Sequence, residues 1–235
     1  KSKFNLQWLR DHCYTEINNK KYDSPYIFWD SNLKKNFSKI KLNHNDIISN
    51  DSYLKKWLQL LHSYGFAIVR NSPTKKKSGF KILNRISHHR ETFFGTPFEV
   101  INIPKPNNTA YTAQALRNHT DLPYFEYAPG YQFLHCLIND ASGGKSSVVD
   151  GFAVANHLKR KEKDVYSLLT KTYVKFKDTD YTQKAIRVLH SPIITLTKDN
   201  DFNDIRFSMA AMGIIDVNPK KMKKFYEAYQ YFASL

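Results

Sequence analysis

The sequence predicts an α+β fold in which helices flank an all-β core, either a sandwich or a barrel. Three observations favour this fold. Apolar residues recur at helical spacing in several segments, nearly continuous apolar runs of strand length lie between these segments, and turn-forming Gly, Pro and Asn residues separate the two kinds of segment. No internal repeat is visible in the chain.

The clearest helical segment begins at residue 51. Its apolar residues recur every three or four positions, and lysines occupy the opposite side. Asp51 or Ser52 can cap its first turn, and Gly65 is suited to end it in a left-handed conformation. Further helices are expected over residues 79–93, 154–169 and 220–232.

Five short apolar runs are expected to be strands. The longest covers residues 131–138 and is nearly all apolar or aromatic. The others cover residues 66–69, 147–150, 193–197 and 205–207. The first 36 residues are polar and irregular apart from short aromatic runs such as Tyr26-Ile27-Phe28-Trp29. We therefore expect residues 1–36 to form a small β-rich amino-terminal domain and residues 37–235 to form one larger domain.

The composition is that of a globular protein. Hydrophobic residues make up 41% of the 235 residues and aromatic residues 14%, which is ample material for a folded core. No run of about 18 apolar residues and no secretory pattern is present, so we expect a cytoplasmic protein without a membrane segment. The two cysteines, Cys13 and Cys136, are far apart in sequence, and a disulfide framework is not expected.

The formal net charge of +15 raises the alternative of a nucleic-acid-binding protein. The basic residues are mostly Lys, and they recur in several short clusters rather than in one block. These clusters are Lys34-Lys35, Lys55-Lys56, Lys75 to Lys77, Lys159 to Lys163 and Lys220 to Lys224. This pattern is more typical of solvated faces, and we expect no nucleic-acid partner.

His-x-Asp is the shortest motif that can offer an imidazole and a carboxylate to one metal ion, because residues i and i+2 of a strand point to the same face. A second His would complete a facial triad, which leaves positions open for a bidentate co-substrate and oxygen. Roughly one His-x-Asp/Glu is expected by chance in this composition. The chain contains three: His44-x-Asp46, His89-x-Glu91 and His119-x-Asp121.

The third motif is the best candidate for a metal site. His44-x-Asp46 lies in a polar stretch that suits a turn or a helix start, and His89-x-Glu91 falls inside an expected helix, where i and i+2 do not face each other. His119-x-Asp121 instead precedes the longest apolar run and stands about two dozen residues before a Gly-Gly loop. The alternative is a turn with an incidental His.

Four ordered motifs resemble the catalytic domain of the γ-butyrobetaine and trimethyllysine dioxygenase family. They are Asn107-Asn108-Thr109-Ala110-Tyr111-Thr112, then His119-Thr120-Asp121-Leu122-Pro123, then Pro129-Gly130-Tyr131-Gln132-Phe133-Leu134-His135-Cys136, and last Gly143-Gly144-Lys145-Ser146 with Val149-Asp150-Gly151-Phe152. Flanking similarity at Trp8-Leu9-Arg10-Asp11-His12-Cys13 and Gly65-Phe66-Ala67-Ile68-Val69-Arg70 extends the resemblance over nearly the whole chain.

The resemblance implies a double-stranded β-helix, or jelly roll, in a catalytic domain over residues 37–235. It implies Fe(II) held by His119 and Asp121, 2-oxoglutarate as co-substrate near Ser146, and a homodimer. It further implies hydroxylation of a small quaternary amine such as γ-butyrobetaine, with release of succinate and CO2. The substrate-binding residues that it implies are Asn108 for the carboxylate, and Tyr111, Phe94 and Phe98 as an aromatic cage for the trimethylammonium group.

The chain departs from the family pattern at three places. No further Cys stands near Cys13, so a structural zinc site is not expected. Phe207-Ser208-Met209 lacks the second carboxylate-binding asparagine of γ-butyrobetaine hydroxylases. The family's distal iron-binding His and its 2-oxoglutarate-binding Arg are expected beyond Leu235, and neither His135 nor His190 is expected to replace that His. A catalytically silent relative that binds a small molecule remains an alternative function.

Overall fold

The computed structural model describes residues 2–13, 26–106, 109–140, 142–181, 183–215 and 217–235. The chain divides into two compact units, Lys1–Ser72 and Pro73–Leu235. We call them the amino-terminal and the carboxy-terminal unit. The expected domain boundary after residue 36 stays a prediction.

The amino-terminal unit is a parallel strand pair joined through two helices. Its described elements are α1 (Leu6–Asp11), η1 (Ser31–Ile40), β1 (Lys41–Asn43), α3 (His44–Ser49), α4 (Asp51–Tyr64) and β2 (Ile68–Arg70). β1 and β2 pair in parallel, with Leu42 opposite Val69. Parallel strands need a crossover connection, and α3 and α4 supply it.

Helix α4 confirms the expected amphipathic helix. Trp57 and Leu61 are buried. The helix has Asn50 as its N-cap rather than Asp51 or Ser52, because the Asn50 side chain accepts a hydrogen bond from Ser52 N at 2.8 Å. It ends at Gly65, whose φ of 75° is left-handed and whose N–H donates to the Leu61 carbonyl.

The described part of residues 1–36 is not β-rich, contrary to expectation. The stretch before Cys13 forms helix α1, capped by the Asn5 side chain, and η1 begins at Ser31. The aromatic run near residue 29 forms no strand because its side chains pack on the end of α4. Trp29 lies 5.0 Å from the Phe66 ring and donates its indole N–H to the Tyr64 carbonyl.

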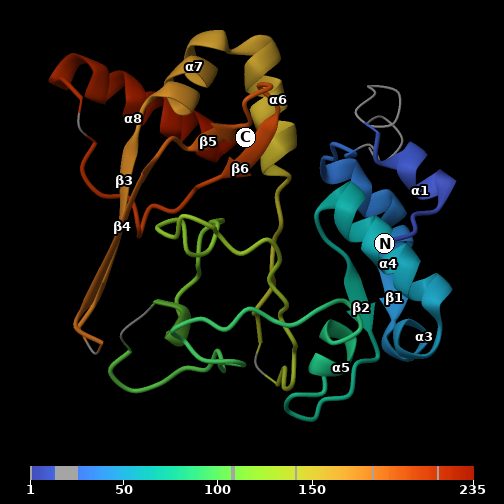
Figure 1. Ribbon diagram of the computed structural model, residues 1–235. Helices are drawn as coiled ribbons and strands as arrows, with labels where there is room; N and C mark the ends of the chain where they lie inside the picture. The colour runs from blue at the N-terminus through green and yellow to red at the C-terminus, as the bar shows by residue number, and fades with distance from the viewer. Residues whose placement is uncertain (1, 14–25, 107–108, 141, 182, 216) are drawn as a thin grey trace. The chain divides into compact units, whose positions relative to one another are not determined.

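The carboxy-terminal unit combines helices with two antiparallel strand pairs. Its described elements are α5 (Phe80–Leu83), η2 (Thr109–Tyr111), α6 (Gly151–Lys161), α7 (Lys163–Lys171), β3 (Val174–Asp180), β4 (Ala185–Ser191), β5 (Ile194–Leu196), β6 (Phe202–Ile205) and α8 (Pro219–Ser234). Figure 1 shows α6, α7 and α8 gathered around β5 and β6, while β3 and β4 form a long hairpin.

The core of this unit lies between those helices and strands. Thirteen buried residues form it: Ala155, Leu158, Leu169, Val174, Phe176, Ile193, Ile194, Ile205, Ile215, Phe225, Ala228, Tyr229 and Phe232. β3 pairs with β4, and residues 211–213 add to the other edge of β3, where the Gly213 N–H donates to the Lys175 carbonyl at 2.7 Å. β5 pairs with β6. The candidate site described below is hydrogen-bonded to the residues that follow β6.

The expected strands over residues 131–138 and 147–150 are wrong for this structure. No strand is assigned to the described residues between 84 and 150. Tyr131, Leu134, Ile138 and Val148 are exposed, and none of the strand pairs among the described residues includes this stretch. Its backbone therefore has no neighbouring strand with which to form a ladder. An apolar run favours an extended backbone, but a strand forms only where a neighbouring strand completes the hydrogen-bond ladder.

Two expected helices also differ from the structure. Of residues 79–93, only α5 is helical, because the following stretch is drawn into other contacts: His89 packs on the Phe80 ring and Arg90 donates to the Tyr127 carbonyl. The helix expected over residues 154–169 is broken into α6 and α7 at Glu162, whose φ of −130° and ψ of 63° are not helical. The final helix is confirmed as α8, which Asn218 caps.

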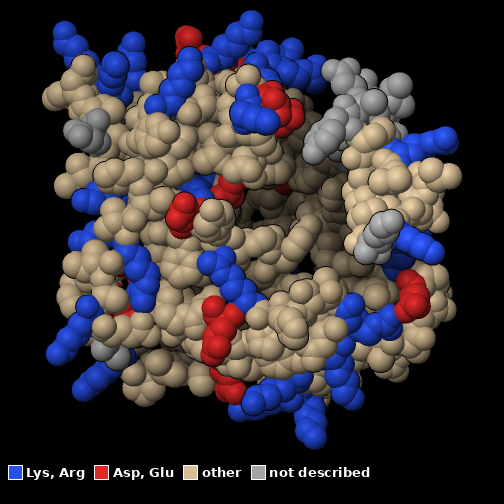
Figure 2. All heavy atoms as spheres, viewed as in Figure 1, with Lys and Arg blue, Asp and Glu red and all other residues tan. Residues whose placement is uncertain are grey.

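The surface carries basic side chains without a membrane-spanning element. Every helix among the described residues is too short or too polar to cross a bilayer. The lysines of the five clusters are exposed. Figure 2 shows Lys and Arg side chains separated by neutral and acidic residues on the visible face, rather than merged into one continuous patch.

Candidate metal centre

The candidate metal ligands His119 and Asp121 face each other at the surface of the carboxy-terminal unit. His119 Nε2 lies 3.0 Å from Asp121 Oδ1, and the two side chains are 37% and 39% exposed. Such exposure leaves the donor atoms open to a small ion from solvent. The pair therefore offers one nitrogen and one oxygen at a single point.

The other ring nitrogen of His119 is held by the backbone. Nδ1 lies 2.7 Å from the Arg117 carbonyl oxygen, which can only accept, so Nδ1 carries a proton and donates. This arrangement leaves Nε2 as the nitrogen that can bind a metal, and it is the usual support of a metal-binding His. The hydrogen bond to Asp121 raises the pKa of His119, and the Arg117 carbonyl adds to this rise.

Asp121 is oriented by Gln132. Gln132 Nε2 donates to Asp121 Oδ2 at 2.6 Å, so the second oxygen, Oδ1, is the one turned toward His119. The hydrogen bond with His119 lowers the pKa of Asp121, and the Gln132 amide lowers it further. The carboxylate form, which is the form that binds metal ions, is thus favoured at neutral pH.

The separation of the two donor atoms fits a shared metal ion. Two adjacent ligands of an octahedral centre, each about 2.1 Å from the ion, stand about 3.0 Å apart. His119 Nε2 and Asp121 Oδ1 have this separation, and an imidazole with a carboxylate matches the donor set of the facial triad. Among the described residues, no group of three His, Cys, Asp or Glu side chains is placed to hold a metal.

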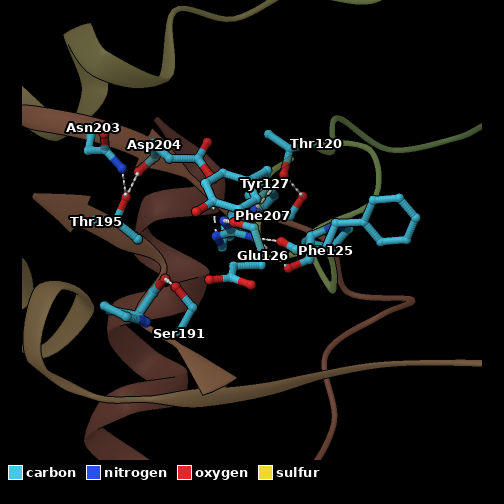
Figure 3. Close-up of polar contacts among 12 residues, drawn as sticks. Thr120, Phe125, Glu126, Tyr127, Ser191, Thr195, Asn203, Asp204 and Phe207 are labelled. Carbon is cyan, nitrogen blue, oxygen red and sulfur yellow. Dashed lines mark hydrogen bonds and ion pairs between the residues drawn. The ribbon is translucent and has the colours of Figure 1, made fainter. Parts of the chain in front are cut away.

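The loop that carries both residues, 119–126, is called the metal loop below. It is anchored to the segment that follows β6. Thr120 and Phe207 are joined by hydrogen bonds in both directions: Thr120 N–H donates to the Phe207 carbonyl at 2.7 Å, and Phe207 N–H donates to Thr120 Oγ1 at 2.9 Å. Figure 3 shows Thr120 beside Phe207, with Phe125 and Glu126 next to them. A residue between the two ligands is thus fixed to the folded core.

The segment that follows the Gly-Gly loop contacts the residue before His119. Ser147 Oγ donates to Asn118 Oδ1 at 2.7 Å, and Asn118 directly precedes His119. Gly143 and Gly144 have φ angles of 103° and 64°, a region that side chains disfavour, so glycine suits both positions. Ser146, the expected co-substrate residue, is exposed and adjoins Ser147.

Two of the three expected cage residues, Phe94 and Phe98, lie next to each other. The rings of Phe94 and Phe98 lie 5.4 Å apart. Tyr111 ends the short helix η2, and among the described residues no ring contact joins it to either Phe. Phe93 carries a resident cation, because Arg187 Cζ lies 3.6 Å from its ring centroid.

Several other predicted residues lie apart from this centre. Asn108 falls outside the described residues. His44 is buried at the start of α3, and Asp46 accepts from the Asn43 side chain, as suits a structural role. His135 is partly buried against Gly79 rather than lying in a strand. The free cysteines Cys13 and Cys136 are both exposed.

Sequence reasoning did not single out Gln132 or Arg206. A signal was available for both, because each is a polar residue inside a mostly apolar run, 131–138 and 205–207 respectively. Such a residue needs a buried or functional partner. Here the partners are Asp121 for Gln132 and the carbonyls of the metal loop for Arg206.

Comparison with known proteins places these features in a family. The profile described as "Taurine catabolism dioxygenase TauD, TfdA family" matches residues 30–235. The chain is 32% identical over 237 residues to gamma-butyrobetaine dioxygenase from Pseudomonas sp. (strain AK-1), a match that covers 100% of this chain and 60% of that protein. Human gamma-butyrobetaine dioxygenase is 30% identical over 242 residues, with 100% and 61% covered.

Trimethyllysine dioxygenases are similar over a shorter stretch. The mitochondrial enzyme from Mus musculus is 33% identical over 174 residues, which covers 74% of this chain and 41% of that protein. The chain spans about 60% of the length of the gamma-butyrobetaine dioxygenases it matches. The resemblance expected from the four motifs is thus confirmed. Because the family profile covers most of the chain, the chain belongs to the TauD/TfdA dioxygenase family.

Proposed function

We propose that the protein is an Fe(II)- and 2-oxoglutarate-dependent hydroxylase of a small trimethylammonium compound resembling γ-butyrobetaine. One observation carries the proposal: in a chain of this family, His119 Nε2 and Asp121 Oδ1 lie 3.0 Å apart, with Nδ1 of the imidazole tied to a backbone carbonyl. This is the arrangement that a two-His, one-carboxylate iron centre requires of its first two ligands.

His119 and Asp121 would hold the iron, and a second His would complete the set. When bound, iron supplies the activation of O2, which couples the oxidative decarboxylation of 2-oxoglutarate to succinate and CO2 with insertion of one oxygen atom into a substrate C–H bond. A bound metal ion would take the place of a proton on His119 Nε2, so binding would release that proton and leave Nε2 and Asp121 Oδ1 as ligands. Gln132 keeps Oδ2 of Asp121 occupied, so Oδ1 remains the metal-binding oxygen.

We place the 2-oxoglutarate near Ser146. The support is indirect: Ser147 bonds to Asn118, and this contact brings the Gly-Gly loop beside His119. A serine hydroxyl can donate to a carboxylate. The co-substrate must reach the iron with its 2-oxo acid end, so a donor on a loop next to His119 is suitably placed to bind it.

The cationic end of the substrate would contact aromatic rings. A trimethylammonium group has no hydrogen-bond donor, so ring faces are suitable partners, each worth about 1 kcal/mol. Phe94 and Phe98 supply two neighbouring rings, and Tyr111 is proposed as the third. The Arg187 guanidinium does not take the place of the substrate cation on the Phe94 and Phe98 rings. It is paired with Asp178 at 2.9 Å and stacks on Phe93 instead.

The acidic end of the substrate is expected to differ from that of γ-butyrobetaine in its contacts. Asn108 is proposed to bind a carboxylate. Ser208 occupies the position at which the resemblance to γ-butyrobetaine hydroxylases would place an asparagine. It directly follows Phe207 and is buried, with 7% of its surface exposed. Its hydroxyl is shorter than an amide and offers a single donor, so a carboxylate would be held more weakly or closer to the loop.

We further propose that the catalytic domain is a double-stranded β-helix and that the protein forms a homodimer. The exposed apolar side chains of residues 131–138 are of the kind that a jelly-roll sheet would cover. The family membership supports the same fold.

Succinate release tests the proposed function. The full-length protein is supplied with Fe(II), 2-oxoglutarate and either γ-butyrobetaine, its neutral isostere with a tert-butyl group in place of trimethylammonium, or taurine. We expect succinate formation that requires iron and is stimulated by the cation, with the isostere weaker by roughly 5- to 30-fold, as 1 to 2 kcal/mol of cation–π attraction implies.

A matched pair of tyrosine variants locates the cage. Tyr111→Leu should lose most of the preference for the cation over the isostere, while Tyr127→Leu, at a side chain that is 74% exposed, should keep it. Stimulation by taurine alone would contradict the substrate class. Absence of succinate with every compound would favour a silent small-molecule-binding relative.

A further inference from the structure

Arg206 is a buried cation whose side chain contacts the metal loop and Asp204. It is 7% exposed and directly follows β6. Its Nη1 donates to the carbonyls of Pro123 at 2.8 Å and Phe125 at 2.6 Å, and its Nη2 donates to the carbonyl of Glu126 at 2.9 Å. Its Nε lies 3.2 Å from Asp204 Oδ2.

The three carbonyls belong to the segment that begins two residues after Asp121. The other side of Asp121 is fixed by the reciprocal hydrogen bonds between Thr120 and Phe207. The short stretch that carries Asp121 is therefore held at both ends by neighbouring residues of one segment, Arg206 and Phe207, as Figure 3 shows for Thr120, Phe125, Glu126 and Phe207.

The backbone between these two anchors is strained. Leu122, which follows Asp121, has a φ of 52°, a left-handed conformation that a branched side chain disfavours. A loop left to itself would relax to a more common conformation and turn Asp121 away from its present direction. Strain of this kind persists only where surrounding contacts enforce it.

The anchoring segment is itself rigid. The Arg206 N–H donates to the Ile193 carbonyl at 2.8 Å, and Ile193 and Ile194 are fully buried in the core. The position of the guanidinium is thus set by the β5–β6 pair rather than by the loop it holds.

We propose that Arg206 is a positioning residue for the metal centre: it fixes the backbone after Asp121 so that the carboxylate stays directed at the point His119 shares. This inference rests on the proposed iron site. A guanidinium is required because its planar fork reaches three carbonyls at once, which the compact ammonium of a lysine cannot do. If only burial of bulk mattered, an apolar side chain would serve the core as well or better.

Co(II) is the probe for this inference, because its visible absorption reports the number and geometry of its ligands without any turnover. Arg206→Lys keeps the charge and Arg206→Met keeps the bulk. Both are expected to weaken Co(II) binding at least tenfold and to change the absorption spectrum. Thr120→Val, which removes the acceptor for the Phe207 N–H, should weaken binding in the same direction and covers the case in which the Arg206 variants do not fold.

Leu169→Ala is the matched control for loss of stability. Leu169 is fully buried in α7, which packs on α6, α8 and β5 and does not carry the metal loop. At a temperature where all variants are folded, the control should bind Co(II) with the wild-type spectrum and affinity.

The outcomes separate this inference from the proposed function. If the wild-type protein does not bind Co(II) in a manner that depends on His119, the metal centre itself is refuted. If the wild type binds but the Arg206 and Thr120 variants bind with unchanged affinity and spectrum, Arg206 has no positioning role. An equal loss in Leu169→Ala would likewise overturn it, because the effect would then follow general stability.

Discussion

Replacing Gln132 by Leu should weaken metal binding without unfolding the protein. The change removes the 2.6 Å hydrogen bond that Gln132 donates to Asp121 Oδ2. A hydrogen bond to a charged group is worth about 1.5 to 3 kcal/mol. The Asp121 side chain is 39% exposed, so water replaces part of what is lost, and about 1 to 1.5 kcal/mol should remain.

This loss corresponds to a roughly tenfold increase in the dissociation constant for the metal, at the low end of the effects seen for outer partners of metal ligands. The assay is anaerobic calorimetric titration with Fe(II), with thermal unfolding of the metal-free protein measured alongside. Gln230→Leu, at an exposed position of α8, is the matched control and should change neither. Unchanged Fe(II) affinity in Gln132→Leu would refute the idea that Gln132 orients Asp121.

Three further predictions concern the carboxy-terminal unit. Burial, with the negative charge of Asp178 second, raises the pKa of Tyr124 to about 12. The unfolded phenol ionises near 10, so the contribution of this group to the unfolding free energy is constant below about pH 10 and falls toward pH 12. Urea unfolding should therefore show a loss of stability between pH 9 and pH 11 that is smaller in Tyr124→Phe, where only the other tyrosines whose pKa burial raises still contribute. Gly213→Ala would place a Cβ 2.8 Å from the Lys175 carbonyl and should cost about 1 to 3 kcal/mol, whereas Gly130→Ala, with open space, should cost far less in the same melting experiment. Asn218→Ala removes the side-chain cap of α8 and should lower the unfolding free energy by about 1 kcal/mol in chemical denaturation. An unchanged unfolding free energy would mean that the cap does not stabilise the helix.

The elements that the sequence predicted well are those that local patterns determine. Helix α4 follows from the spacing of Trp57 and Leu61 and from Gly65, and α8 follows from the same spacing of Phe225 and Tyr229. Each of these signals acts within a few residues, so the sequence alone contains it.

The elements that failed depend on distant partners. The run of residues 131–138 has the composition of a strand, but no described segment pairs with it. The hairpin of β3 and β4 was not predicted, although Val174 and Phe176 alternate with exposed lysines in the way of a half-buried strand. The break at Glu162 carries neither Gly nor Pro, so helical spacing alone could not reveal it.

The candidate site divides in the same way. The His119-x-Asp121 motif could be found because both residues lie within three positions of each other. The contacts that orient it could not, because Gln132 is 11 residues away from Asp121 and the Thr120–Phe207 bonds span 87 residues. A sequence pattern names the ligands, whereas only the folded chain identifies what holds them.

The central claim is that His119 and Asp121 bind one Fe(II) ion, and anaerobic Fe(II) titration of single variants tests it most directly. His119→Ala and Asp121→Ala should each lower the affinity by at least a hundredfold, because each removes one metal ligand. His157→Ala, at an exposed histidine of α6, is the matched control and should bind as the wild type does. Wild-type Fe(II) affinity in either His119→Ala or Asp121→Ala would contradict the claim.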